Sequence, residues 1–150
     1  MSGVDHKAFA TLLTALFDRP VGSERDKPHR DDGEATFGLF FDAEGDSAGV
    51  IAFDLGLAAA SAAALSLRPA PDVDELEAPL DGSIHADFYE VINVLGGIAN
   101  QHSRKHLRLR SIEYGAPAEH WDNSWRVRAF SLDIKGYGAG KVTIALRHSS

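Results

Sequence analysis

Glu90 and Asn93 are the two residues of this sequence whose types and spacing could do chemistry together. They stand three positions apart in a segment of helical periodicity, which places their Cβ atoms about 5 to 6 Å apart on one face. A carboxylate can pair with a cation, and a neutral carboxamide can hold a water molecule because it both donates and accepts hydrogen bonds. The same spacing also occurs on ordinary surface helices, where such residues only face solvent.

The segment that carries this pair is predicted to be the longest helix of the chain, from Ser83, a suitable N-cap residue, to about Lys105. Its apolar residues form a broad stripe that should face the core: Phe88, Val91, Ile92, Leu95, Ile98 and Ala99. A second set should face outward, within about 80° of one another: Ala86, Glu90, Asn93, Gly97 and Asn100. Gly96 and Gly97 each cost about 1 kcal/mol relative to Ala inside a helix. They therefore indicate close approach, either by a neighbouring helix or by a partner's backbone.

The segment from Glu90 to Asn100 resembles the signature helix of the CheC/CheX family of chemotaxis phosphatases. In that family E-x-x-N is followed by small and apolar residues, and commonly by a glycine four places after the Asn. Glu90, Asn93 and Gly97 match these positions. Four residues before the Glu, where the family frequently has Ser or Asp, this chain has Ala86, and Asp87 follows one place late. The predicted element order and the total length are also similar to those of the family.

The resemblance implies a CheX-like phosphatase that hydrolyses the aspartyl phosphate of a CheY-like response regulator, in bacterial chemotaxis or two-component signalling. Glu90 and Asn93 would be catalytic, and Ala86, Gly97 and Asn100 would contact the phosphorylated regulator. The protein would need no cofactor of its own, since Mg²⁺ is expected on the regulator. Two other hypotheses stay open: a binding module that recognises a signalling protein without hydrolysis, and a structural or dimerising domain whose glycines serve helix packing.

The rest of the sequence predicts one α/β (α+β) domain over residues 1–150, with an antiparallel or mixed sheet covered by helices. We expect residues 18–34 to form a mobile loop, because they are charged and interrupted by proline and glycine. The other predicted elements are a helix over 4–17, a hairpin over 35–53, a helix over 57–67, and strands over 107–114, 125–134 and 142–146. The apolar phase of the strand over 125–134 changes along its length, which predicts a β-bulge near Phe130.

Composition narrows the classes of partner and site. The absence of cysteine excludes disulfides and thiolate metal sites, and a formal net charge of −7 disfavours a nucleic-acid partner. The sequence has neither a long apolar run nor a secretory signal, so we expect a cytoplasmic protein without membrane contact. We expect no metal site: His102 and His106 should mark a solvated helix end, and the acidic stretch from Asp42 to Asp46 a solvated turn. Exposed sheet edges in such folds can pair between subunits, so a homodimer is one expected assembly.

Overall fold

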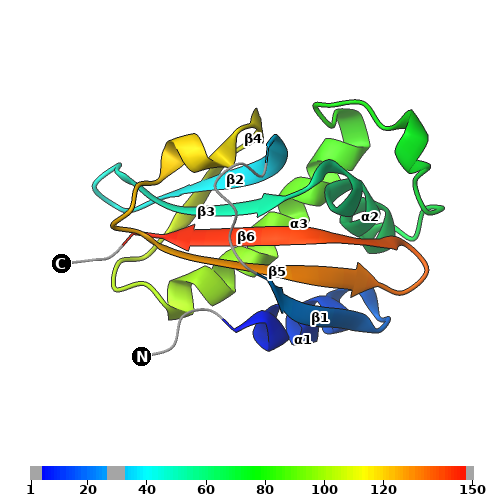
Figure 1. Cartoon of the computed structure of the whole chain (residues 1–150), viewed down its shortest axis with the longest axis horizontal. Coiled ribbons are helices and arrows are strands. Elements are labelled where there is room, and N and C mark those ends of the chain that lie inside the picture. Colours follow the sequence, from blue (N-terminus) through cyan, green and yellow to red (C-terminus); the bar gives the residue numbers. More distant parts are fainter. Residues whose placement is uncertain (1–4, 27–32, 148–150) are drawn as a thin grey trace.

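The computed structural model describes residues 5–26 and 33–147. The strands are β1 (Val21–Asp26), β2 (Ala35–Phe41), β3 (Ser47–Phe53), β4 (Arg108–Gly115), β5 (Arg126–Ile134) and β6 (Gly138–Leu146). The helices are α1 (His6–Phe17), α2 (Leu55–Leu65) and α3 (Gly82–Gln101), with short 3-10 helices η1 (Val73–Glu75) and η2 (Pro117–His120). The strands form one sheet in the order β1-β5-β6-β3-β2-β4, in which all neighbours are antiparallel (Figure 1). The predicted α+β architecture, an antiparallel sheet covered by helices, is confirmed.

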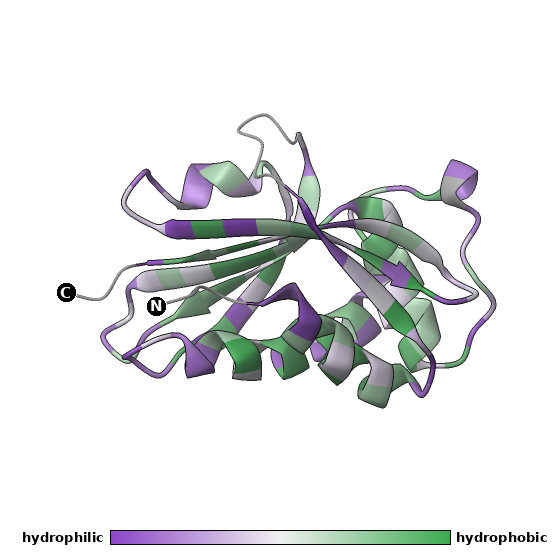
Figure 2. Ribbon diagram, turned by 60° about the horizontal axis from the view of Figure 1, so that its bottom comes forward, coloured by the Kyte–Doolittle hydropathy of each residue, from purple (hydrophilic) through white to green (hydrophobic). Residues whose placement is uncertain are grey.

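The two faces of the sheet are covered differently. The three α-helices lie together on one face, while η2 lies on the other (Figure 2). Because side chains alternate along a strand, each central strand contributes to both sides. On the helical side Phe40, Ile51 and Phe53 join the main core with residues of all three helices. On the other side a smaller cluster is formed by Ala35, Phe37, Leu39, Val50, Ala52 and Ala145.

The loop predicted over residues 18–34 is in part a strand. Val21–Asp26 form β1 and pair with β5, from Val21 opposite Ile134 to Asp26 opposite Ala129. The local sequence hides this strand because Val21 is its one buried residue, and the pairing partner lies far along the chain. Residues 27–32 of the predicted loop lie outside the described residues.

The bulge predicted near Phe130 is wrong. The register of β5 is continuous against both β1 and β6. The apolar phase changes because the two ends of the strand are covered on opposite faces: Val127 packs against the smaller cluster, whereas Phe130 and Leu132 belong to the helical core. A change of apolar phase can therefore reflect a change in which face is covered, without any extra residue in the strand.

Helix boundaries follow capping groups. Helix α2 begins at Leu55 because the Asp54 side chain accepts a hydrogen bond from the backbone N–H of Leu57 at 2.8 Å. Helix α3 begins after Asp81 and ends at Gln101, four residues before the predicted end at Lys105. It is still the longest helix, as expected.

Candidate functional site

Helix α3 is held against β2 by two glycines, one on each element. A Cβ atom at Gly38 of β2 would lie 2.6 Å from Ile92 Cγ2, and one at Gly96 of α3 would lie 2.7 Å from Phe40 Cε2. Both distances are shorter than real Cβ contacts, so the helix and the strand can approach this closely only because neither glycine has a side chain. The predicted core stripe of α3 is buried throughout, with Phe88, Val91, Ile92, Leu95 and Ala99 fully inaccessible. The helix is therefore a rigid support for whatever its outer face carries.

The outer face of α3 presents Glu90 and Asn93 to solvent. Both residues are exposed, as are Ala86 and Gly97 of the same face. Among the described residues neither Glu90 nor Asn93 has a hydrogen bond, ion pair or ring contact with another side chain or with the backbone outside the helix. The carboxylate and the carboxamide are thus free to engage a group outside the chain, and the structure brings four of the five predicted site residues onto one open surface.

Gly97 differs from Gly96 in its surroundings. A Cβ atom at Gly97 would have nothing within 4 Å. Packing inside the protein therefore explains the glycine at position 96 but not the one at position 97. The close approach that the sequence predicts at Gly97 would have to come from outside the chain.

Asn100, the fifth predicted site residue, is engaged within the chain. Its Nδ2 donates to the backbone oxygen of Leu107 at 3.1 Å, and its Oδ1 accepts from the backbone N–H of Leu107 at 2.7 Å. This pair of hydrogen bonds ties the last turn of α3 to the chain just before β4. Since the amide is satisfied by backbone groups, Asn100 has a structural role within the chain, and its contact with a partner stays a prediction.

Asp87, which lies one turn before Glu90, is also engaged within the chain. Ser66 at the end of α2 donates its hydroxyl to Asp87 Oδ2 at 2.5 Å, and Arg68 forms an ion pair with the same oxygen. This carboxylate therefore links the end of α2 to α3. It is not available to take the place of the Ser or Asp that the CheC/CheX family frequently has at the position of Ala86. No feature of the sequence pattern indicated this contact, because its partners lie beyond the end of another helix.

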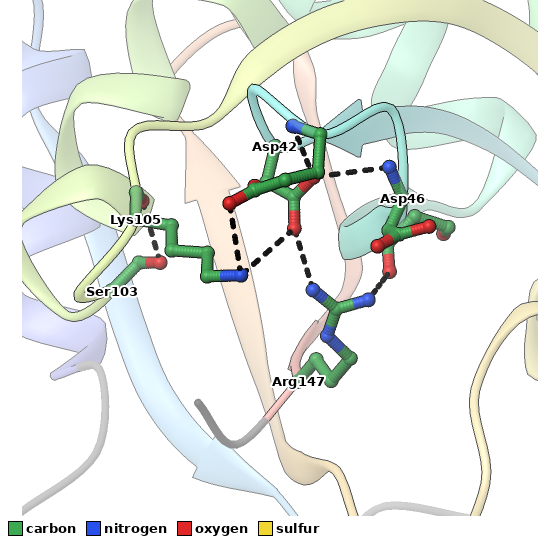
Figure 3. Close-up of polar contacts among 7 residues, drawn as sticks. Asp42, Asp46, Ser103, Lys105 and Arg147 are labelled. Carbon is green, nitrogen blue, oxygen red and sulfur yellow. Dashed lines mark hydrogen bonds and ion pairs between the residues drawn. The ribbon is translucent and has the colours of Figure 1, made fainter. Parts of the chain in front are cut away.

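A polar cluster braces the end of the sheet near the α3–β4 connection (Figure 3). Asp42 accepts hydrogen bonds from the backbone N–H groups of Glu44 and Asp46, each at 3.0 Å, and from Arg147 Nη2 at 2.6 Å; Lys105 Nζ lies 3.9 Å away. The hydrogen bond from Asp46 is the main cause that lowers the pKa of Asp42, and Arg147, Glu44 and Lys105 act in the same direction against the opposing effect of burial. Asp42 is 6% exposed, so the prediction of a solvated turn is wrong for this residue. Its role is to connect the β2–β3 turn with the end of the chain.

The described residues contain no group of three or more His, Asp or Glu side chains placed to hold a metal ion. Because α3 ends at Gln101, His102 and His106 do not share a helical turn. Among residues 5–26 and 33–147, no helix combines the length and the apolar character that crossing a membrane requires.

The fold is the one shared by CheX proteins and the middle domain of FliM. No protein-family model matches the sequence, and no curated protein matches it. The solved structures with the same fold include CheX in a CheX–CheY–BeF₃–Mg²⁺ complex from Borrelia burgdorferi, with a TM-score of 0.58 at 14% identity over 97% of this chain and all of that one. They also include the FliM middle domain from Vibrio alginolyticus, with a TM-score of 0.62 at 8% identity over 94% of this chain and 89% of that one.

A third similar structure is FliY from Thermotoga maritima, with a TM-score of 0.57 at 19% identity over 93% of this chain and 82% of that one. The resemblance to the CheC/CheX family that the E-x-x-N segment indicates is thus confirmed at the level of the fold.

Proposed function

We propose that this protein is a phosphatase that hydrolyses the aspartyl phosphate of a response regulator, with Glu90 and Asn93 as its catalytic residues. The observation that carries the proposal is their placement: both are exposed and unengaged, one turn apart, on a helix whose opposite face is fully buried. The likeness to a CheX that was solved bound to CheY with BeF₃ and Mg²⁺ supports the choice of partner.

The proposed chemistry requires few groups from the phosphatase. Hydrolysis of a phosphoryl group needs a water molecule held in line with phosphorus and stabilisation of the charge that develops on the phosphoryl oxygens. The Asn93 carboxamide would hold that water by accepting one hydrogen bond from it or donating one to it. The Glu90 carboxylate would pair with a cationic side chain beside the regulator's phosphoaspartate and fix the register of the two proteins. The metal ion, Mg²⁺, would belong to the regulator.

Two neighbouring positions should shape the contact. Ala86 and Gly97 lie on the same exposed face, before and after the pair, and both lack bulk. Because the residues beside them are small, the longer side chains of Glu90 and Asn93 can enter a recessed pocket on a partner. We therefore propose that both positions lie under the regulator in the complex.

The test measures phosphate release from a panel of purified receiver domains charged with acetyl phosphate and Mg²⁺. Asn93→Ala should lower the rate by on the order of 10²-fold, about 2.7 kcal/mol, which is the scale for losing one positioning or polarising group. Glu90→Ala should mainly raise KM, because the ion pair would act in docking. Melting temperatures should stay within about 2 °C, since both side chains are exposed and unengaged.

Matched controls lie on the other side of the sheet. Glu119 of η2 and Asn123 shortly after it are exposed residues of the same two types. Glu119→Ala and Asn123→Ala should leave both kcat and KM unchanged. A rate that survives Asn93→Ala would rule out the catalytic role.

The alternative function is a binding module on the same scaffold. The structural neighbours include the FliM middle domain, solved in a complex with FliG as well as on its own, so the same fold occurs in an assembly of that kind. Following complex formation and phosphate release separately distinguishes the two hypotheses. A complex with a charged receiver domain that forms through Glu90 and Asn93 but releases no phosphate would favour the binding module.

A further inference from the structure

Leu67 occupies a backbone position that normally belongs to glycine. Helix α2 ends with Ser66 as its C-cap; the N–H of Arg68 donates to Ala63 O at 2.9 Å and the N–H of Leu67 to Ala64 O at 3.4 Å. This pair of hydrogen bonds defines a Schellman motif, in which the residue after the cap adopts the left-handed conformation. Leu67 does so, with φ at 55°. A side chain there is unfavourable because its Cβ approaches the following carbonyl oxygen, and glycine avoids this contact.

Burial gives no reason for the leucine either. Leu67 is 74% exposed, which makes it one of two exposed large hydrophobic residues in the described part of the chain, the other being Tyr89 at 36%. The backbone conformation favours glycine and the exposure favours a polar residue. Neither the stability nor the solubility of this chain accounts for a leucine here.

The contacts of its neighbours place Leu67 beside the proposed site. Ser66 and Arg68, the residues on either side of it, both bind the carboxylate of Asp87. Asp87 lies one turn before Glu90 on α3, which is a distance of about 5 to 6 Å between Cβ atoms. The end of α2 is therefore fixed to the flank of the exposed face of α3, and Leu67 is held between two anchored residues.

A protein interface of ordinary size, centred on Glu90 and Asn93, would reach Leu67. A stable complex buries about 800 Å² on each partner, a patch roughly 30 Å across. A regulator centred on Glu90 and Asn93 would cover the flank marked by Asp87 as well. Tyr89 would be covered on the opposite flank, because at about 100° per residue it and Asp87 lie on different sides of Glu90.

We propose that Leu67 is an apolar docking residue that inserts into a hydrophobic patch beside the phosphorylation pocket of the same response regulator. The inference rests on the proposed function and adds the residue that selects among regulators: those with an apolar patch at this distance from the phosphoaspartate bind, and those with a charged one do not. Leu67 acts in recognition and takes no part in the hydrolytic step.

The test uses Leu67→Gly in the full chain and receiver domains charged with beryllofluoride and Mg²⁺. Affinity should fall by about 10-fold, the low end for losing one buried leucine side chain. The melting temperature should stay the same or rise, because glycine fits the left-handed conformation. With acetyl-phosphate-charged regulator, KM should rise in proportion while kcat at saturation stays unchanged. Leu67→Met, which restores an apolar side chain, should bind nearly as well as the native protein.

Asp18 supplies a matched control. It ends α1 with φ at 52° and, like Leu67, is a non-glycine residue with a left-handed backbone. Asp18→Gly should change the melting temperature in the same direction and leave receiver binding unaffected.

Three results would overturn the inference. Unchanged affinity in Leu67→Gly, with turnover lost in Asn93→Ala, would remove the docking role and leave the proposed function in place. Reduced self-association of Leu67→Gly in sedimentation, with unchanged receiver binding, would assign Leu67 to a contact between copies of this chain. If no charged receiver domain binds the native protein, the proposed function and the docking role fail together.

Discussion

Gly96 and Gly97 are adjacent in α3 but occupy different faces of the helix, and the reasons for the two glycines differ. At position 96 an added Cβ would lie 2.7 Å from the buried ring of Phe40, whereas at position 97 it would meet open space. The first glycine is required by packing of the helix on the sheet. The second has no such requirement within the chain. Packing therefore explains only one of the two glycines, and the proposed contact of Gly97 with a regulator is a separate prediction.

A substitution at Gly96, the buried glycine of the two, should have the largest effect on stability. Gly96→Ala should destabilise the protein by about 1–3 kcal/mol, the usual range for overpacking a core, although alanine is the better helix former. The measurement is the free energy of unfolding in urea. Equal or greater stability of the variant would show that Phe40 can move away from α3, and would remove the packing explanation for Gly96.

A substitution at Asn100 tests whether the end of α3 serves to stabilise the fold or to contact the regulator. Asn100→Ala leaves the backbone N–H and C=O of Leu107, a buried residue, without their partner, so the protein should lose about 1–2 kcal/mol of stability. Binding of a charged receiver domain should not change at temperatures where the variant is folded. Weaker binding with unchanged stability would restore the partner contact that the sequence predicts for Asn100.

The smallest effect on stability, and one of opposite sign, should come from Gly97. Gly97→Ala should stabilise the protein by up to about 1 kcal/mol, because alanine is favoured in a helix and the space is open. The same variant should weaken regulator binding and raise KM, since a partner that approaches the helix backbone would meet the added methyl group. Thermal melting together with titration of a charged receiver domain measures both. Unimpaired binding would place the interface away from this turn of α3.

The parts of the structure that the sequence predicted are those with local causes. The buried stripe of α3 follows from helical periodicity, and the hairpin of β2 and β3 from alternation around a short turn. The exposure of Glu90 and Asn93 follows from the same periodicity, because residues opposite a buried stripe face away from the core.

The parts that the sequence did not predict depend on distant partners. Asp42 is buried because Arg147, far along the chain, binds its carboxylate. Asn100 is engaged by backbone groups, which carry no sequence signal. Leu67 was placed at the end of a predicted helix, but neither its left-handed backbone nor its exposure can be inferred from an apolar letter in the sequence.

The position of β1 has a consequence for biosynthesis. This strand is near the start of the chain, yet it pairs with β5 near the end, and Phe9 of α1 packs edge-on against Phe130 of the same distant strand at 5.0 Å between ring centres. While the chain leaves the ribosome, residues 6–26 emerge long before their binding surface exists. They remain without this partner until β5 has been made, so a segment synthesised before the rest of the sheet is among the last to reach its place, and such long-range closure is slow.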